Sequence, residues 1–277
     1  MTAGVDAATA QALPLPPAFW LPEGDAFRAT VAGRGPWSMG HLHGGPPAAL
    51  LARALELDAA TSAVPLRAAR ITVAFHRPVA IDVFRVSVEL VREGKKVRIA
   101  RAYLTDLAGR AVATAEALFV RRADVGVAAT VHPTPRAPEA CDPWQFPFFT
   151  TSAVGYHTAM ETRLLAGTFG TGKMALWIRM RVPLVPGEAP SGLQRVVCAA
   201  DSGNGVSVGV DLAEYTFLNP DLTVSLAREP QGEWVALDAT THFGADGIAL
   251  AESALLDVAG FVGRGLQTLV VERRASS

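Results

Sequence analysis

Apolar residues recur along the chain in two similar series, and each series predicts one buried helix together with an antiparallel β-meander. In the first series, five runs with alternating or continuous apolar residues predict strands. These runs cover residues 27–33, 69–75, 83–91, 96–106 and 110–122. Residues 47–58 carry Ala and Leu almost all round, from Ala48 to Leu57, which is typical of a helix that is buried on every side.

The second series has the same coarse order. Its predicted strands cover residues 158–167, 173–183, 221–229, 233–244, 248–257 and 263–274, and its helix covers about 191–200. One helix and an antiparallel meander, found twice, indicate the α+β class.

The two series also align with each other at a constant spacing of 151 residues. At this spacing, residues 97–109 align with residues 248–260, and both segments end on Asp-x-Ala-Gly, a turn signal. The same spacing aligns 72–75 with 223–226, and 116–122 with 267–273, with no gap. A repeat of this length is the size of a domain.

The repeat predicts three parts of the chain. Residues 1–122 and 150–277 would form two similar domains. Residues 123–149 are rich in Pro and show no clean period, so they predict a linker whose aromatic end packs on the second domain.

Composition narrows the classes of partner. Half of the 277 residues are apolar and the formal net charge is −1, so we expect a sizeable core and neither a nucleic-acid nor a membrane partner. There is no signal-peptide pattern and no apolar run of about 20 residues, which predicts a soluble cytoplasmic protein. Cys141 and Cys198 are too few for a disulfide scaffold and are expected to be reduced.

The segment before the first helix carries candidate chemistry. His43 is followed by Gly44 and Gly45, and Pro47 suits a first helical turn. Glycines allow a backbone to approach a ligand closely, and the start of a buried helix can hold an oxyanion or a polarised carbonyl group. A tight turn into a core helix, with His43 as an incidental cap, explains the same residues equally well.

With these motifs the sequence resembles the acyl-CoA thioesterase family of the thioesterase II type. The matching segments are HLHGGPPAALLARAL (41–55), AAD (199–201), FLNPDLTVSLAREP (217–230), EWVALDATT (233–241) and GLQTLVVERR (265–274). The resemblance implies a double hotdog fold, in which each half wraps a sheet around a central helix. It also implies hydrolysis of an acyl-CoA or a related acyl thioester, without a cofactor or a metal ion.

The resemblance further implies the residues of the site. In this family an Asp, a Ser or Thr, and a Gln position the water that attacks the thioester. The Asp falls on Asp201 and the Gln on Gln267, while the hydroxyl position falls on Asn219. A shift of a few residues offers Thr223 for the hydroxyl instead. His43, Gly44, Gly45 and Thr223 are the expected substrate-binding residues.

One half alone is expected to carry this polar set. At the repeat spacing, Leu50, Glu116 and Ala68 stand opposite Asp201, Gln267 and Asn219. Without the resemblance, Asp201 would be an ordinary turn residue and Gln267 a solvated strand residue. The covalent pairing of two hotdogs permits a monomer, whereas the resemblance implies a homo-oligomer.

Two other functions remain open from the sequence. A hotdog hydratase or dehydratase acting on an acyl thioester pairs a catalytic His with an Asp or Glu, so His43 would then be the key residue. A non-catalytic protein that binds acyl thioesters is the other alternative, with Asn219 as the sign of a lost site.

Overall fold

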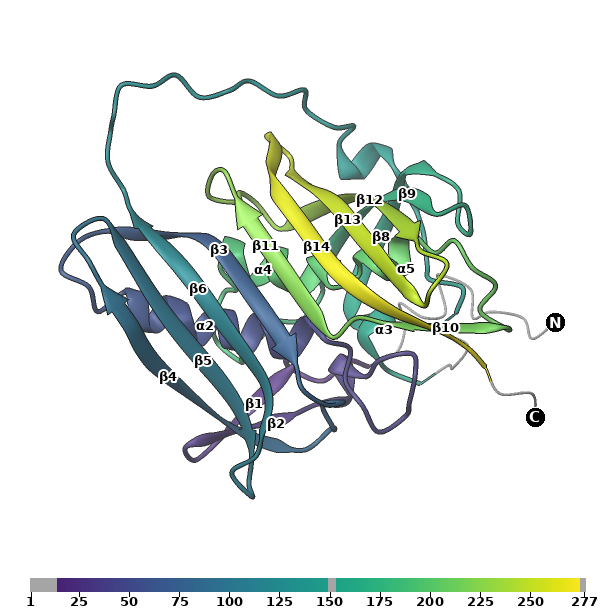
Figure 1. Cartoon of the computed structure of the whole chain (residues 1–277), viewed down its shortest axis with the longest axis horizontal. Helices are drawn as coiled ribbons and strands as arrows, with labels where there is room; N and C mark the ends of the chain where they lie inside the picture. Colours follow the sequence, from purple (N-terminus) through teal and green to yellow (C-terminus); the bar gives the residue numbers. More distant parts are fainter. Residues whose placement is uncertain (1–13, 149–152, 275–277) are drawn as a thin grey trace.

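The strands form one continuous, strongly curved antiparallel sheet (Figure 1). The structure is a computed structural model that describes residues 14–148 and 153–274. Within these residues the strand order is β1-β2-β4-β5-β6-β3-β11-β14-β13-β12-β9-β8-β7, and β10 pairs with β14 beside this path.

The first half of the chain supplies six strands and the longer helix. Its elements are β1 (Trp20–Glu23), β2 (Ala26–Ala29), the 3-10 helix η1 (Val31–Gly33), α2 (Gly45–Ala59), β3 (Leu66–Phe75), β4 (Val83–Glu93), β5 (Val97–Asp106) and β6 (Ala111–Arg121). The strand expected at 27–33 is wrong in its second part, because Thr30 caps η1 by accepting a hydrogen bond from the Ala32 N–H. The other four strands and the helix are confirmed.

The second half supplies the other strands and α4. Its elements are the 3-10 helix η2 (Pro138–Ala140), β7 (Asp142–Pro143), α3 (Tyr156–Ala159), β8 (Met160–Gly167), β9 (Lys173–Met180), α4 (Gly192–Ala200), α5 (Gly203–Val206), β10 (Tyr215–Leu218), β11 (Asp221–Leu226), β12 (Trp234–Phe243), β13 (Ile248–Asp257) and β14 (Gly260–Arg273). The helix expected near 191–200 is therefore confirmed.

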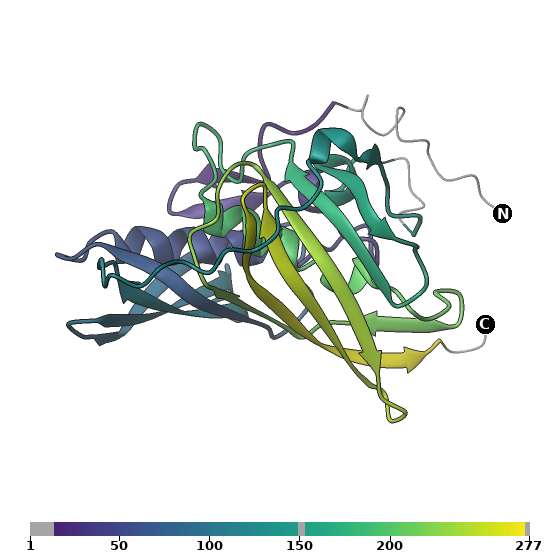
Figure 2. The same ribbon diagram turned by 90° about the horizontal axis from the view of Figure 1, so that it is seen from above.

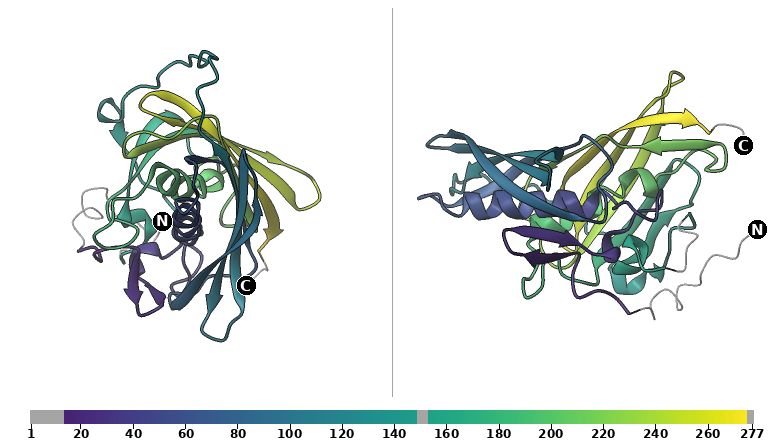
Figure 3. Two further views of the ribbon diagram at one scale, coloured as in Figure 1. Left: turned by 90° about the vertical axis from the view of Figure 1, so that its left-hand side faces the viewer. Right: turned by 90° about the horizontal axis from the view of Figure 1, so that it is seen from below.

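The sheet wraps around α2 and α4, which lie side by side on its concave face (Figure 3). Leu50, Leu51 and Leu55 of α2 are buried in the core between the helices and the sheet. The expectation that α2 is buried all round is wrong at Leu57, whose side chain is 55% exposed. One face of α2 near its end therefore reaches the surface.

The two halves join through an antiparallel pair of strands. β3 pairs with β11, and Thr72 stands directly opposite Thr223, its counterpart in the repeat. Their two Oγ1 atoms lie 3.1 Å apart. Because each of these equivalent residues pairs with the other, an approximate two-fold axis passes between them.

The last strand of each half departs from the constant spacing. Thr72 pairs with Glu116 across β3 and β6, whereas Thr223 pairs with Leu266 across β11 and β14. The counterpart of Glu116 is therefore Leu266, and that of Gln267 is Ala117; the gapless alignment is wrong here by one residue. Gln267 and Ala117 are both buried, as this register requires.

The spacing is also wrong in the helices. α2 begins after its N-cap Gly44, and α4 begins after its N-cap Ser191. When the N-caps are matched, the counterpart of Asp201 is Ala54 and not Leu50. Helices tolerate such shifts because the loops before them differ in length.

The repeated Asp-x-Ala-Gly segments form the predicted turns. The Asp106 carboxylate accepts a hydrogen bond of 3.0 Å from the Ala108 N–H, and the Asp257 carboxylate accepts one of 2.8 Å from the Ala259 N–H. Gly109 and Gly260 follow with positive φ angles of 80° and 108°, which favour glycine.

The segment between the halves runs from β6 to β7 mostly as extended chain without regular secondary structure (Figure 2). Its aromatic end packs on the second half as expected, since the centroids of the Trp144 and Phe169 rings lie 6.0 Å apart. Residues 1–13 of the first predicted domain and Phe149 of the predicted linker lie outside the described residues. The boundaries at 122 and 149 stay a prediction. No helix in the described residues is long and apolar enough to cross a membrane.

Candidate active site

The start of α2 lies against the end of α4, and the two glycines make this approach feasible. A methyl group on Gly44 would lie 2.7 Å from Asp201 Oδ2, and one on Gly45 would overlap the carbonyl oxygen of Cys198. The sequence predicts that the glycines leave room for a ligand, whereas in the structure the end of α4 fills much of this room. Their place beside the Asp201 carboxylate keeps them at the candidate site.

Asp201 ends α4 and is bracketed by side chains from two other elements. The side chain is only 3% exposed. Asn219, which precedes β11, donates from Nδ2 to Asp201 Oδ1 at 2.8 Å. His43, which precedes α2, places Nδ1 2.9 Å from Asp201 Oδ2. The first half of the chain therefore contributes a side chain to the carboxylate of the second half.

The contact between His43 and Asp201 requires a shared proton. Two unprotonated acceptor atoms would repel each other at this distance, so a proton lies on His43 Nδ1 or on Asp201 Oδ2. The Gly45 N–H also points at His43 Nδ1, at 3.1 Å. The His43 ring has an exposed fraction of 13%, and so it is more open than the carboxylate.

Tyr156 packs against the His43 ring and is itself held by Ser202, and no sequence motif points to either residue. The rings of His43 and Tyr156 are stacked, with centroids 3.8 Å apart and planes 2° apart. The Tyr156 hydroxyl donates to the Cys198 carbonyl at 2.9 Å and lies 2.9 Å from Ser202 Oγ. Burial raises the pKa of Tyr156 well above its usual value, so it stays protonated. Neither residue falls in a motif, because their role depends on contacts between distant segments.

Gln267 holds the backbone that carries Asp201. From β14 its Nε2 donates to the Asp201 carbonyl at 3.0 Å, and its Oε1 accepts from the Asn204 N–H at 2.9 Å. The side chain is 2% exposed, so the alternative of a solvated strand position is wrong. Gln267 thus bridges the end of α4 to the start of α5.

Thr223 lies apart from this cluster. It alternates along β11 with Leu222 and Val224, which face the core, so it points to the opposite face of the sheet. Its hydroxyl contacts Thr72 rather than Asp201. Asn219 is therefore the residue that stands beside the carboxylate, and the position offers an amide in place of a hydroxyl.

Aromatic side chains gather next to α5, directly after Asp201. A methyl group on Gly205 would lie 3.2 Å from the Phe148 ring. Trp37 stacks on Phe148 with centroids 6.4 Å apart, and meets Phe217 edge-on at 5.5 Å. The described residues contain no group of three or more His, Cys, Asp or Glu side chains that could hold a metal ion.

Comparison with known proteins shows the family. Residues 33–122 match the family model of the acyl-CoA thioesterase N-terminal domain, and residues 138–271 match that of the acyl-CoA thioesterase C-terminal domain. The chain therefore belongs to the acyl-CoA thioesterase family. A search of curated proteins found no match to the sequence.

Solved structures share the fold. A candidate thioesterase from Novosphingobium aromaticivorans is 21% identical, with a TM-score of 0.69 over 91% of this chain and 98% of that chain. A candidate thioesterase II from Thermobifida fusca is 19% identical, with a TM-score of 0.70 over 93% and 96% of the two chains. A hot dog fold protein of unknown function from Alicyclobacillus acidocaldarius is 16% identical, with a TM-score of 0.69 over 99% and 100%. The predicted α+β double hotdog is thereby confirmed.

Proposed function

We propose that this protein hydrolyses an acyl-CoA or a related acyl thioester at Asp201. The observation that carries the proposal is the buried Asp201 carboxylate, whose two oxygens face Asn219 and His43 from different parts of the fold. The family to which the chain belongs supports the class of substrate. The aromatic side chains of Trp37, Phe148 and Phe217 supply an apolar wall for the acyl group.

In the proposed reaction, a water molecule attacks the carbonyl carbon of the thioester while its proton passes to the Asp201 carboxylate. The carbonyl oxygen becomes an oxyanion, and the carbon–sulfur bond then breaks. The departing thiolate takes up the proton, which gives a free thiol and a carboxylic acid. The backbone N–H groups of Gly44 and Gly45 stabilise this oxyanion, because Pro46 and Pro47 have no N–H group to donate.

Two residues serve this reaction by positioning. We propose that Asn219 holds the Asp201 carboxylate and that Gln267 holds the turn behind it, as their hydrogen bonds suggest. The Gly45 N–H already contacts His43 Nδ1. In the proposed reaction the oxyanion replaces His43 Nδ1 as the acceptor for this N–H.

The test is Asp201→Asn, which keeps the shape of the side chain but removes the base. Loss of a general base typically lowers the rate by about 10²–10⁴-fold, so we expect thiol release from acyl-CoA to fall at least about a hundredfold. Asp238→Asn, at an exposed position of β12, is the matched control and should keep full activity. Asn219→Ala removes one hydrogen bond to a charged group and should cost about tenfold. Unchanged turnover in Asp201→Asn would show that the base is a different residue.

One observation favours a second candidate function. The 2.9 Å contact between His43 and Asp201 is the His–carboxylate pair that a hotdog hydratase or dehydratase would use. Water addition to a 2-enoyl-CoA would identify this activity, and it is measured as the loss of the ultraviolet absorbance of the enoyl thioester. An enzyme that hydrates the enoyl group but releases no thiol would replace our proposal, and a protein with neither activity would be an acyl-thioester-binding protein.

A further inference from the structure

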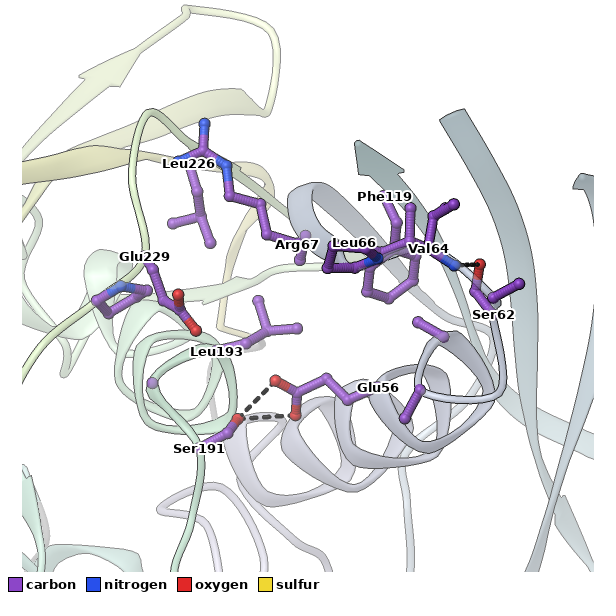
Figure 4. A pocket seen from close by; sticks show the side chains of 17 residues that line it. Glu56, Ser62, Val64, Leu66, Arg67, Phe119, Ser191, Leu193, Leu226 and Glu229 are labelled. Carbon is purple, nitrogen blue, oxygen red and sulfur yellow. Dashed lines mark hydrogen bonds between the residues drawn. The ribbon is translucent and has the colours of Figure 1, made fainter. Parts of the chain in front are cut away.

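A cavity lies beside Glu56 of α2 and Ser191 at the start of α4 (Figure 4). Asp201 lies at the other end of α4. The volume of the cavity is about 380 Å³. This is within the range of about 300–1,000 Å³ that is usual for small-molecule sites. The last turn of α2, the start of α4, the start of β3 and the end of β11 form its walls.

The approximate two-fold axis relates this cavity to the Asp201 site. Asn219 donates a hydrogen bond to the Asp201 carboxylate. Gly44 lies next to the same carboxylate and also next to the Phe75 ring. The equivalent positions in the other half all line the cavity. The three pairs of equivalent positions are Asn219 and Ala68, Phe75 and Leu226, and the N-caps Gly44 and Ser191. The cavity is therefore the second copy of the same structural frame.

The wall of this cavity contains a carboxyl group and a hydroxyl group, and an amide next to the wall contacts the carboxyl group. Glu56 accepts hydrogen bonds from Ser191 Oγ at 2.7 Å and from Gln194 Nε2 at 2.8 Å. Burial raises the pKa of Glu56, and this outweighs the two hydrogen bonds that lower it. The carboxyl group thus favours its neutral form more than an exposed Glu does, and a neutral carboxyl group can donate a hydrogen bond to a carbonyl oxygen.

The rest of the lining suits an apolar group with an anionic tail. Phe119, Leu193 and Leu226 offer apolar surface beside Glu56 (Figure 4). At the rim, the Glu229 carboxylate is paired with Arg122, and its negative charge also raises the pKa of Glu56. Arg67 adds a positive charge there, with its guanidinium group bound to the Ala227 carbonyl at 3.1 Å.

We propose that this cavity is a second binding site for an acyl thioester, with the acyl group against Phe119 and Leu193 and the thioester carbonyl facing Glu56. The class of ligand rests on the proposed function of the Asp201 site. The second site binds its ligand without hydrolysing it, because Ala68 and Ala117 stand where the first site has Asn219 and Gln267. In the part of the chain that the structure describes, the Glu56 carboxyl group accepts hydrogen bonds from Ser191 and Gln194 and from no strand residue.

The experiment is calorimetric titration with S-octyl-CoA, a thioether that cannot be hydrolysed. We expect two molecules to bind per chain of the wild type. Ala63→Trp fills the mouth of the cavity from an exposed position and should bind one molecule. Ala108→Trp, at an exposed position of the β5–β6 turn, is the matched control and should bind two. Glu56→Ala should weaken the second site about tenfold, because it removes the group that donates to the carbonyl oxygen.

Either of two results would overturn the inference: one molecule per wild-type chain, or two molecules per chain of Ala63→Trp. S-octyl-pantetheine, which lacks the nucleotide, tests whether the second site needs the nucleotide. Two bound molecules of it would show that the part common to carrier-protein and CoA thioesters is sufficient, whereas binding of S-octyl-CoA alone would assign the ligand to coenzyme A. Thiol release is measured separately, so its absence would contradict the proposed function and not the number of sites.

Discussion

At the scale of single residues, His43 is the link between the two halves at the candidate site. Its Nδ1 atom contacts Asp201, and its ring stacks on Tyr156. In a hydrolase that uses Asp201 as the base, His43 is a positioning residue. In a hydratase it would itself exchange a proton with the substrate.

Substitution of His43 separates these two roles. The amide of His43→Asn can replace Nδ1 as a donor to Asp201, whereas His43→Ala leaves the carboxylate without that partner. A hydrogen bond to a charged group is worth about 1.5–3 kcal/mol. We therefore expect His43→Ala to lower kcat for thioester hydrolysis about 10- to 100-fold at little changed KM, and His43→Asn to recover most of it. Equal loss in both variants would assign the histidine ring a direct role in proton transfer.

Asp257 gives a prediction about stability and pH. Burial raises the pKa of its carboxyl group, but hydrogen bonds from Arg228 at 2.5 and 2.6 Å, with those from Gln231 and Ala259, bring the net shift below the usual value. A lowered folded-state pKa stabilises the protein above the unfolded pKa, about 3.9, and this stabilisation is lost as the pH falls through the folded-state pKa.

Asp257→Asn should therefore lower the free energy of unfolding by about 2–3 kcal/mol near pH 7. The difference from the wild type should shrink as the pH falls below about 4, where the wild-type carboxylate takes up its proton. Urea denaturation at several pH values measures both effects. A constant difference across this pH range would contradict an ionic role for Asp257.

At the scale of elements, the close crossing of α2 and α4 positions the site. Gly45→Ala would place a methyl group into the Cys198 carbonyl oxygen, which is backbone and cannot move aside alone. Overpacking of this kind typically costs about 1–3 kcal/mol. We expect a loss of this size in the free energy of unfolding and a fall in activity, because Asp201 sits on the displaced helix. Gly40→Ala, whose methyl group would meet only Ser38 Oγ at 3.9 Å, is the control and should change neither.

The elements themselves were largely predictable, whereas their exact registers were not. Alternating apolar residues predicted β3 to β6, and Ala and Leu residues predicted α2, because burial on one face or all round leaves a periodic pattern. The change of register that pairs Leu266 with Thr223 left no such signal. It arises because the second half has one residue fewer than the first half between two of its strands. Asp201 and Gln267 were found through the family motifs, but the Tyr156 contact depends on packing across 42 residues from Cys198.

At the scale of the whole molecule, the two halves hold each other through contacts that do not involve the linker. β3 and β11 pair over five residues on each strand, and α2 packs along α4. Residues 123–131, in contrast, are exposed throughout. The linker thus supplies one copy of each half per chain and keeps the two halves at a high effective concentration. The sheet and the helices determine how the halves are arranged.

A cut in the linker should therefore leave the molecule assembled. A protease site inserted after Gly126, where the backbone is exposed and Cβ atoms would meet open space, allows cleavage of the folded protein. We expect both fragments to elute together, with thiol release within about twofold of the uncut protein, because Asp201 and His43 remain paired across the interface. Light scattering before and after cleavage also tests the expected homo-oligomer, which a 29.1 kDa particle at micromolar concentration would reject. Fragments that separate, or that stay together without activity, would show that the covalent connection itself maintains the site.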